Sequence, residues 1–259
     1  MRIVRFTVRE QTGYGLLEDS LIHGLAEDPF TSLADARDWR LDGRTYPLAE
    51  AKLLAPCLPS KIICLGVNYR PHAQEMKSNL PRNPLIFLKP PSAIIGPDDS
   101  IVLPRGWERV DYECELAVVI GKKGKYIPEE NWREFVLGYT CFNDVTERQI
   151  QRDDGQWTRS KSFDTFAPCG PWIDTAVQPD DLKLETYLNG EQRQSSRTSE
   201  LIFGVSTLIS FISGVMTLLP GDVIATGTPG GIAPMKPGDV VEVKIEKIGT
   251  LRNTVVAPG

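Results

Sequence analysis

Residues 111–121 read Asp-Tyr-Glu-Cys-Glu-Leu-Ala-Val-Val-Ile-Gly, an acidic start followed by an apolar run that ends at a glycine. This pattern predicts a β-strand, in which alternate residues share a face. Glu113 and Glu115 then lie about 7 Å apart on one face, and the even-numbered positions from Cys114 to Ile120 face the other way. Repulsion between the glutamates raises the pKa of one unless a cation joins them, and such carboxylates suit Mg²⁺, Mn²⁺ or Ca²⁺. The alternative is a solvent-facing strand edge whose glutamates bind nothing.

A third acidic residue ends a second apolar strand, Tyr139-Thr-Cys-Phe-Asn-Asp144. Asp144 stands just before a predicted helix over 145–152, so it is placed either as a third oxygen ligand or as a helix N-cap. Arg148 and Gln151 follow at i+4 and i+7, on the same face as Asp144 if the helix runs there. A cation and an amide beside a metal ion suit an anionic substrate.

The segment Gly66-Val-Asn-Tyr-Arg-Pro-His-Ala-Gln-Glu-Met76 carries a candidate acid–base pair. Pro71 favours the first position of a helix, which places His72 and Glu75 at i and i+3, within reach of one another. A carboxylate that orients a histidine ring and raises its basicity can activate water. The alternative is an ordinary surface ion pair. The other histidine, His23, has no such context.

Two further stretches could contribute polar groups to a site. Lys161 lies among small and aromatic residues in Trp157-Thr-Arg-Ser-Lys-Ser-Phe-Asp164, although an isolated lysine is ordinarily solvated. The loop Thr226-Gly-Thr-Pro-Gly-Gly-Ile232 could present backbone N–H groups to a carboxylate, or it is simply a turn. It lacks the G-x-x-x-x-G-K-[ST] pattern, so phosphate binding is not implied.

The remaining apolar stretches are short, and 20 prolines and 22 glycines scattered between them indicate a turn-rich β architecture. Strands are predicted over residues 1–8, 13–17, 21–24, 61–66, 85–88, 94–95, 100–102, 112–120, 135–142, 170–174, 183–188, 222–226 and 240–245. Helices are predicted over 128–132, 145–152 and 206–216. The most polar window, 191–200, is expected to be a solvated loop or a mobile flap near a site.

The chain is expected to divide near residue 58. The first ~55 residues contain short strands and a polar helical stretch over 32–40, and a proline-bearing linker over 54–60 follows them. We therefore expect a small N-terminal α/β domain over residues 1–57 and a larger domain over 58–259. A length of 259 residues agrees with one or two domains and is long enough to bury a full core without disulfides.

Composition excludes several classes of protein. The net charge of −5 and the pI of about 5.3 argue against a strongly basic nucleic-acid binder. No apolar run reaches the ~18 residues that a membrane span needs, and the charged, alternating N-terminus predicts a strand rather than a signal peptide. The five cysteines are odd in number and widely spaced, so we expect buried thiols and a cytoplasmic protein rather than disulfides or a thiolate zinc site.

The order of the motifs identifies a family. The series G-V-N-Y-R-P-H-A-Q-E-M, F-L-K-P-P, D-Y-E-C-E-L-A-V-V-I-G, G-Y-T-C-F-N-D-V-T-E-R-Q-I-Q, S-K-S-F-D-T and G-D-V-I-A-T-G-T-P-G-G closely resembles the fumarylacetoacetate hydrolase superfamily over about residues 58–255. It is especially similar to the acylpyruvase, oxaloacetate decarboxylase and 2-hydroxyhepta-2,4-diene-1,7-dioate isomerase branches. The resemblance implies an α+β, mainly β fold whose catalytic domain is a β-sandwich roll, assembled as a homodimer.

The resemblance also implies roles for individual residues. It assigns Mg²⁺, with Mn²⁺ or Ca²⁺ as options, to Glu113, Glu115 and Asp144. The implied catalytic residues are His72 and Glu75, on a lid helix, and Lys161; the implied substrate contacts are Tyr69, Arg148, Gln151 and Thr228. The chain departs from many relatives at Val67, where they carry arginine or lysine, and from some at Gly230, where they carry lysine.

These observations predict a metal-dependent enzyme that acts on a small 2-oxo acid. The expected reaction is cleavage of the C3–C4 bond, by hydrolysis of an acylpyruvate or by decarboxylation of oxaloacetate, through an enolate that the cation stabilises. In the hydrolytic case His72 and Glu75 activate water and Lys161 stabilises the oxyanion. An isomerase or tautomerase that forms the same enolate by deprotonation is the alternative. A non-catalytic metal-binding protein is a third possibility, from a different class.

Overall fold

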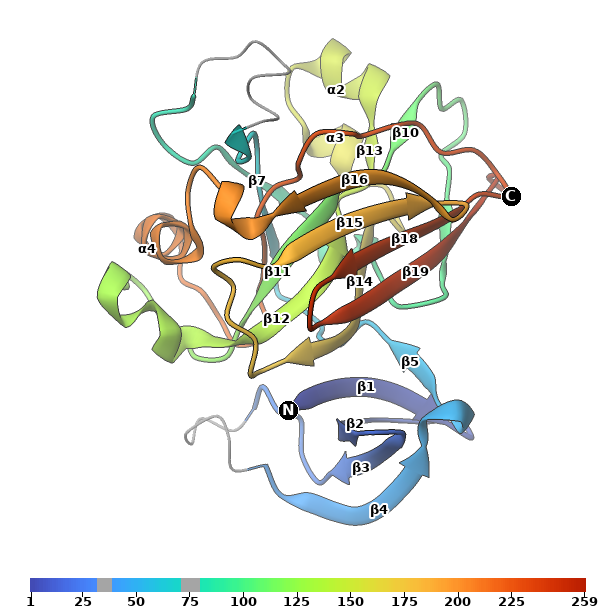
Figure 1. Cartoon of the computed structure of the whole chain (residues 1–259), viewed down its shortest axis with the longest axis vertical. Coiled ribbons are helices and arrows are strands. Elements are labelled where there is room, and N and C mark those ends of the chain that lie inside the picture. Colours follow the sequence, from blue (N-terminus) through green and yellow to red (C-terminus); the bar gives the residue numbers. More distant parts are fainter. Residues whose placement is uncertain (32–38, 71–79) are drawn as a thin grey trace.

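The computed structural model describes residues 1–31, 39–70 and 80–259, and its regular structure in these ranges is mainly β, as predicted (Figure 1). The largest sheet has 12 strands among the described residues, in the order β4-β3-β2-β1-β14-β12-β11-β17-β6-β7, with β5 and β8 attached at its sides. Its strands are β1 (Arg2–Val8), β2 (Gln11–Glu18), β3 (Leu21–Leu25), β4 (Leu41–Pro47), β5 (Lys52–Leu54), β6 (Ile62–Leu65), β7 (Ile86–Lys89), β8 (Ile94–Ile95), β11 (Cys114–Ile120), β12 (Val136–Asn143), β14 (Ala167–Asp174) and β17 (Val223–Ala225).

A second sheet packs across part of the first. Its strands follow the order β16-β15-β18-β19-β9, and a two-stranded ribbon of β10 and β13 lies near the candidate site. The bounds of these strands are β9 (Ser100–Val102), β10 (Val110–Asp111), β13 (Thr146–Glu147), β15 (Lys183–Leu188), β16 (Glu191–Arg197), β18 (Val240–Ile245) and β19 (Gly249–Val256). Apolar side chains of β11, β15, β18 and helix α4 share one buried cluster, so the two sheets enclose a common core.

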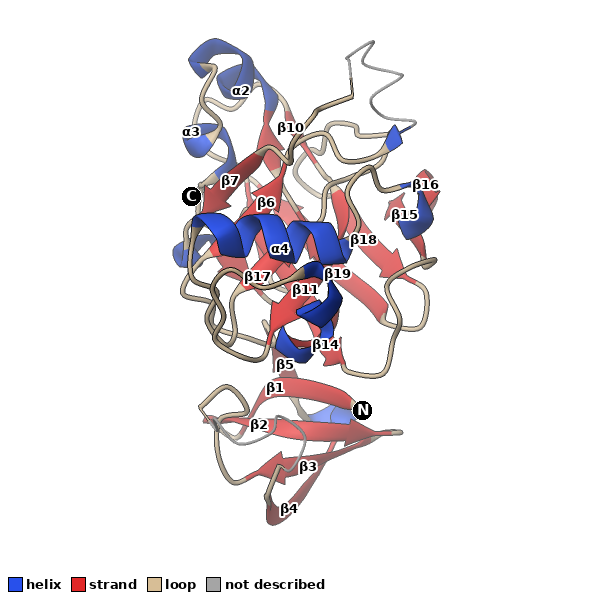
Figure 2. Cartoon of the chain, turned by 90° about the vertical axis from the view of Figure 1, so that its left-hand side faces the viewer, coloured by secondary structure: helices blue, strands red, loops and turns tan. Residues whose placement is uncertain are grey.

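Helices are short and lie outside the sheets (Figure 2). They are α2 (Arg148–Asp154), α3 (Thr158–Lys161) and α4 (Val205–Val215), with 3₁₀ turns η1 (Leu48–Glu50), η2 (Pro91–Ala93), η3 (Glu129–Phe135) and η4 (Thr198–Glu200). The predicted helix over 206–216 is α4, whereas the one predicted over 128–132 is the 3₁₀ turn η3. The helix predicted from residue 145 begins only at Arg148, because Thr146 and Glu147 pair with Asp111 and Val110 as strand β13.

Strand β11 carries the face pattern that its sequence predicts. Leu116 and Val118 belong to the core between the two sheets, and Ala117 and Val119 belong to the cluster on the opposite face. Every residue of the strand is buried, since both faces are covered by other elements. The solvent-facing edge considered for this stretch is therefore wrong.

Three strands were missed because their side chains are mostly polar. The window expected as a solvated loop or flap contains β16, an edge strand that pairs with β15. Its side chains are mainly exposed, so no apolar alternation marks it, and Gln194 is its one buried residue. Strand β4 is likewise almost fully exposed, and in β19 the buried Asn253 interrupts the apolar alternation of Leu251 and Val255.

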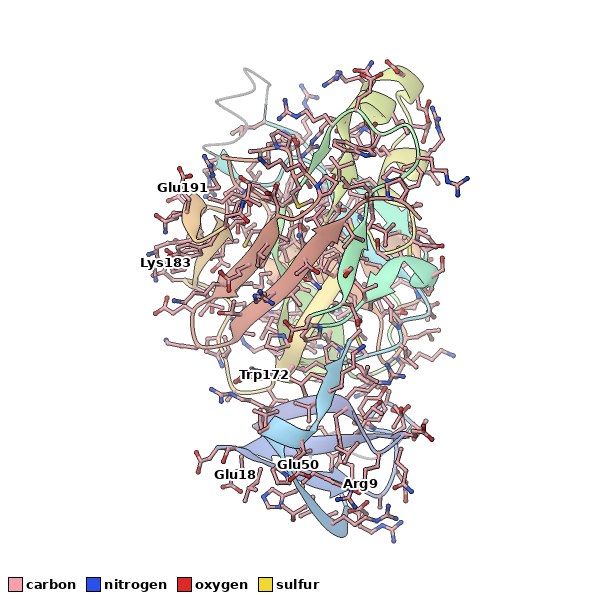
Figure 3. All side chains as sticks on the ribbon, turned by 90° about the vertical axis from the view of Figure 1, so that its right-hand side faces the viewer. Arg9, Glu18, Glu50, Trp172, Lys183 and Glu191 are labelled. Carbon is pink, nitrogen blue, oxygen red and sulfur yellow. The ribbon has the colours of Figure 1, made fainter. Side chains whose placement is uncertain are left out.

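The N-terminal strands continue the large sheet at one end of the molecule (Figure 3). Strand β1 pairs with β14 at Arg2↔Asp174, and the Arg2 guanidinium lies 4.9 Å from the centre of the Trp172 ring at this junction.

Most of the helix predicted over 32–40 falls on residues 32–38, outside the described part of the chain. No helix of the described residues combines the length and hydropathy needed to cross a membrane. All five cysteines are buried and free, as expected.

Candidate active site

Three acidic side chains converge at the centre of the site: Glu115 in β11, Glu113 just before that strand, and Asp144 just after the neighbouring strand β12. One carboxylate oxygen each from Glu113, Glu115 and Asp144 lies within 4.8 Å of the others, and all three residues are buried. The backbone of the two strands holds them together: Asp144 N–H donates to Glu113 O at 2.9 Å, and Glu113 N–H donates to Asn143 Oδ1 at 2.8 Å. Asp144 is not a helix N-cap, because helix α2 begins at Arg148 and is capped by Glu147.

Two buried lysines and one partly buried arginine neutralise part of this charge. Lys161 Nζ donates to Glu113 Oε2 at 2.9 Å and to Asp144 Oδ2 at 2.6 Å, so the lysine bridges two of the three acids. Lys89 Nζ donates to the other oxygen of Asp144 at 2.5 Å and to Val145 O at 3.0 Å. Arg148 forms an ion pair with Glu113. Asp144 is therefore held from both of its oxygens.

Arg148 is fixed in the site by a second carboxylate. Its Nε donates to Asp111 Oδ2 at 2.9 Å, and its Nη1 donates to Gln151 Oε1 at 2.9 Å. Asp111 is fully buried and also accepts two hydrogen bonds from Arg109. The expected neighbourhood of Arg148, Gln151 and the acids thus forms, although through the first turn of α2 rather than through a helix that starts at Asp144.

The carboxylate of Glu115 is the one that no cation contacts among the described residues. Its Oε2 accepts the Gly227 N–H at 2.7 Å, while its buried Oε1 has no hydrogen-bond partner in the described part of the chain. Burial raises its pKa well above the ordinary value, and the charges of Asp144 and Glu113 raise it further. An oxygen-only donor set with a bare, buried acceptor is what a hard divalent cation requires. The residues present therefore fit such an ion.

The pKa of Glu113 is lowered, whereas that of Glu115 is raised. Burial alone would raise its pKa, but Arg148 and Lys161 outweigh that effect and lower the pKa to about 2. Glu113 is therefore ionised over the whole physiological range. Two neighbouring glutamates on one strand face thus have pKa values shifted in opposite directions, because one faces two cations and the other faces two anions.

The glycine-rich loop after β17 closes the site from above. Asn68 fixes this loop, since its Nδ2 donates to Thr226 O at 2.7 Å and its Oδ1 accepts the Phe203 N–H at 2.8 Å. Gly227 has φ +97°, and a Cβ at this position would lie 2.8 Å from Asn68 Cβ. The loop was expected to offer a backbone N–H to a carboxylate. In the structure the Gly227 N–H donates to a carboxylate of the protein, that of Glu115.

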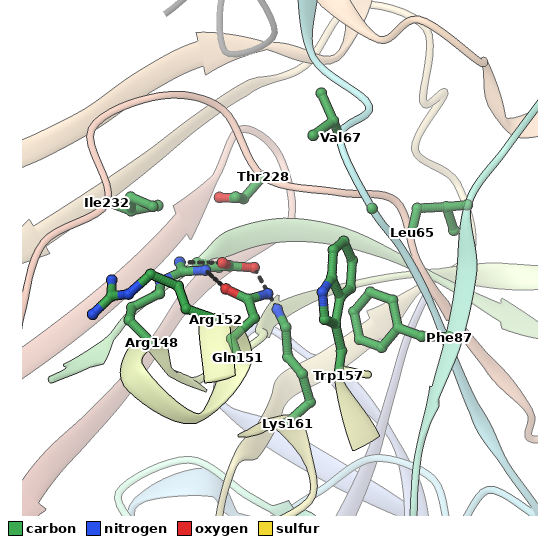
Figure 4. A pocket seen from close by; sticks show the side chains of 12 residues that line it. Leu65, Val67, Phe87, Arg148, Gln151, Arg152, Trp157, Lys161, Thr228 and Ile232 are labelled. Atoms are coloured by element: carbon green, nitrogen blue, oxygen red, sulfur yellow. Dashed lines mark hydrogen bonds and ion pairs between the residues drawn. The ribbon is translucent and has the colours of Figure 1, made fainter. Parts of the chain in front are cut away.

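A cavity of about 290 Å³ opens above the acids (Figure 4). Its polar floor contains Glu113, Arg148, Gln151 and Lys161, and Thr228 projects from the glycine-rich loop on the opposite side. Its apolar wall consists of Leu65, Val67, Phe87, Trp157 and Ile232. The Phe87 and Trp157 rings pack edge to face at 5.2 Å, and Lys161 Nζ lies 5.0 Å from the centre of the Phe87 ring. The cavity therefore combines an ionic floor with an apolar wall.

The residues selected from the sequence divide into three groups. Glu113, Lys161, Arg148, Gln151 and Thr228 line the cavity, and Glu115 and Asp144 lie with Glu113 in the acidic cluster. Tyr69, expected to contact substrate, is fully buried in the core between the sheets and is not among the described residues that line the cavity. His72 and Glu75 lie outside the described residues.

Lys89 is the main residue that the sequence reasoning missed. The signal was available: a lysine closes the apolar strand Ile86-Phe-Leu-Lys89 and is followed by two prolines. A lysine at the end of an apolar strand reaches solvent only if the strand face on which it lies is exposed. Here the Lys89 side chain is fully buried and pairs with Asp144.

We expect Lys89→Met to weaken Mn²⁺ binding roughly 10- to 100-fold, as the loss of a partner that orients a metal-binding side chain does. The variant leaves Asp144 Oδ1 and Val145 O without their shared donor. Electron paramagnetic resonance of free Mn²⁺ measures the affinity. Lys61→Met is the control, because Lys61 pairs with the buried Asp222 away from the cavity; equal Mn²⁺ affinities in the two variants would contradict the prediction.

Comparisons with known proteins agree with this geometry. The family model described as fumarylacetoacetate (FAA) hydrolase C-terminal matches residues 61–256, and the one described as Rv2993c-like, N-terminal, matches residues 1–56. A rat protein named oxaloacetate tautomerase Fahd2a, mitochondrial, is 44% identical over 222 residues, which cover 81% of this chain and 71% of the rat protein.

Two solved structures carry the comparison further. A 2-hydroxyhepta-2,4-diene-1,7-dioate isomerase from Mycobacterium marinum is 44% identical with a TM-score of 0.92, covering 100% of this chain and 99% of the other. A maleylpyruvate hydrolase from Sphingobium sp. SYK-6, in complex with manganese(II) and pyruvate, is 33% identical with a TM-score of 0.80, and both chains are fully covered. The site, the fold and these similarities together show that the chain belongs to the fumarylacetoacetate hydrolase family.

Proposed function

We propose that this protein is a divalent-cation-dependent enzyme that isomerises a small 2-oxo acid between its keto and enol forms. The observation that carries the proposal is the acidic cluster below the cavity, with the bare Oε1 of Glu115 among three converging carboxylates. Glu113, Glu115 and Asp144 would hold the cation. When bound, a divalent cation supplies Lewis-acid polarisation of a carbonyl oxygen, worth several kcal/mol.

The groups that line the cavity suit an anionic substrate whose oxygens accept hydrogen bonds. Burial alone would lower the pKa of Lys161, but Asp144 and Glu113 raise it above the ordinary value, so the amine is protonated and acts as a donor rather than as a base. Arg148 is held rigidly by Asp111 and Gln151. Preorganised cations beside an apolar wall stabilise an enolate oxygen more strongly than water does.

Isomerisation is favoured over cleavage by similarity, since the relatives named as a tautomerase and an isomerase are each 44% identical to this chain. Cleavage of the C3–C4 bond is the second candidate, and the 33% identical hydrolase with bound pyruvate supports it. Both reactions pass through an enolate, so the residues on the cavity floor serve either one.

A substrate panel separates the two reactions. We expect the protein with Mg²⁺ or Mn²⁺ to change the ultraviolet absorbance of enol-oxaloacetate faster than buffer does, without formation of pyruvate. Excess EDTA should remove this activity, and added Mn²⁺ should restore it. Stoichiometric pyruvate from oxaloacetate or an acylpyruvate would instead establish cleavage. Activity that survives EDTA unchanged, or no turnover of any 2-oxo acid, would overturn the proposal.

A further inference from the structure

Gln194 joins the glycine-rich loop of the candidate site to strands β11 and β15. It lies on the edge strand β16, yet its side chain is only 1% exposed. Its Oε1 accepts the Cys114 N–H at 3.0 Å and the Thr186 hydroxyl at 2.7 Å. Its Nε2 donates to Pro229 O at 2.9 Å and to Thr228 Oγ1 at 2.9 Å. All four hydrogen-bonding positions of the amide are therefore occupied.

The orientation of this amide follows from two backbone partners. The Cys114 N–H can only donate, so it requires the oxygen of Gln194, and Pro229 O can only accept, so it requires the nitrogen. A flipped amide would place a donor against a donor and an acceptor against an acceptor. Thr228 Oγ1, which contacts the same nitrogen, must therefore act as an acceptor toward Gln194.

The proton of the Thr228 hydroxyl is consequently left for another partner. A hydroxyl carries one proton, and the described residues offer that proton no acceptor. Thr228 lines the cavity and lies across it from Arg148, Gln151 and Lys161 (Figure 4). The hydroxyl proton is therefore available to an acceptor in the cavity.

We propose that Gln194 is a positioning residue that fixes the polarity of Thr228, so that its hydroxyl donates to an anionic oxygen of the substrate. The inference rests on the proposed function, which it deepens: the substrate must present an acceptor-only oxygen, such as a carboxylate or enolate, to the loop side of the cavity. Gln194 touches no substrate itself and acts through Thr228.

Oxalate is the probe, because it offers acceptor oxygens only and its binding is measured without turnover. Calorimetry with the Mn²⁺-loaded protein should show Thr228→Val weakening oxalate binding roughly 10- to 100-fold, the effect of one hydrogen bond to a charged group. Thr228→Ser, which keeps the hydroxyl, should stay within about threefold of the wild type. Equal affinities of Thr228→Val and the wild type would overturn the proposal.

The role of Gln194 is tested by a double-mutant cycle. Gln194→Met removes the N–H that Thr228 Oγ1 accepts, so the hydroxyl is no longer fixed as a donor toward the ligand. We expect Gln194→Met to weaken oxalate binding as Thr228→Val does, with no further loss in the double variant. A purely structural role would make the two losses multiply, and that outcome overturns the proposal. Mn²⁺ affinity should be unchanged in each variant.

If circular dichroism shows that Gln194→Met is unfolded, the nearly isosteric Gln194→Glu takes its place in the same cycle. The added negative charge of Gln194→Glu weakens oxalate binding whether residue 228 is threonine or valine. The proposal is supported only if Gln194→Glu weakens binding less in the Thr228→Val protein than in the wild type. Equal losses of affinity in the two proteins overturn it. Oxalate binding without turnover of any 2-oxo acid would overturn the proposed function alone. A wild type that binds no oxalate would overturn both.

Discussion

Replacing Glu115 with glutamine should abolish divalent-cation binding and lower turnover by about 10³-fold, while it stabilises the metal-free protein. The loss in rate corresponds to the several kcal/mol that a Lewis-acidic ion contributes. The gain in stability arises because Glu115 is buried beside Asp144 and Glu113 with no cation in contact among the described residues. Glutamine keeps an acceptor for the Gly227 N–H and carries no charge. Mn²⁺ titration, steady-state kinetics and thermal unfolding in EDTA measure the three effects.

The stability difference should depend on pH in a defined direction. The pKa of Glu115 is raised in the folded protein, so the folded state holds a proton that the unfolded state releases. The metal-free wild type therefore loses stability as the pH rises above the ordinary carboxyl pKa, and the advantage of Glu115→Gln grows over that range. Equal unfolding temperatures of the two proteins at pH 8 would contradict this account.

Glu185→Gln is the matched control. Glu185 is also a buried glutamate, but it lies in the second sheet, where Lys183 Nζ donates to its Oε1 at 2.7 Å, away from the cavity. Its replacement removes a favourable ion pair, so it should lower stability slightly and leave Mn²⁺ affinity and turnover unchanged. Opposite signs of the two stability changes would show that the effect at Glu115 comes from burying its carboxyl group beside two anions with no cation in contact among the described residues.

The acidic cluster was predictable because it depends on local geometry. A period of two residues places Glu113 and Glu115 on one face, and the antiparallel pairing of β11 with β12 brings the end of one strand to the start of the other, so that Asp144 meets them. The motif order in the sequence also indicated the mainly β fold. Features that depend on strand alternation and chain order were therefore within reach of sequence reasoning.

The partners of those acids were not predictable in the same way. Lys89 contacts Asp144 across 55 positions, and Gln194 reaches Cys114 across 80, so both contacts depend on how the sheets assemble. The sequence around Gln194 is almost uniformly polar, which made a buried amide look like part of a loop. The start of α2 was misplaced for a similar reason: pairing of Thr146 with Asp111 overrides the helical tendency of the residues that follow.

The second large effect is expected from Gly227→Ala, which should destabilise the protein by about 2–5 kcal/mol and remove most of its activity. The estimate combines the positive φ of +97° with a contact of 2.8 Å between the new Cβ and Asn68 Cβ. Displacement of the loop also withdraws the Gly227 N–H from Glu115 and moves Thr228 away from the cavity. Chemical denaturation and kinetics with saturating Mn²⁺ measure the two losses.

Gly238→Ala separates the strain of the backbone from the clash. Gly238 has a similar φ of +93°, but a Cβ there meets nothing within 4 Å, and the residue does not line the cavity. We expect it to cost about 1–2 kcal/mol for the positive φ alone and to leave kcat and Mn²⁺ affinity unchanged. If the two alanine variants instead lost equal stability and kept equal activity, the close approach of Gly227 to Asn68 would have no part in shaping the site. A loss of activity confined to Gly227→Ala, with the larger loss of stability, would show that the glycine is required because the loop passes too close to Asn68 to admit a side chain.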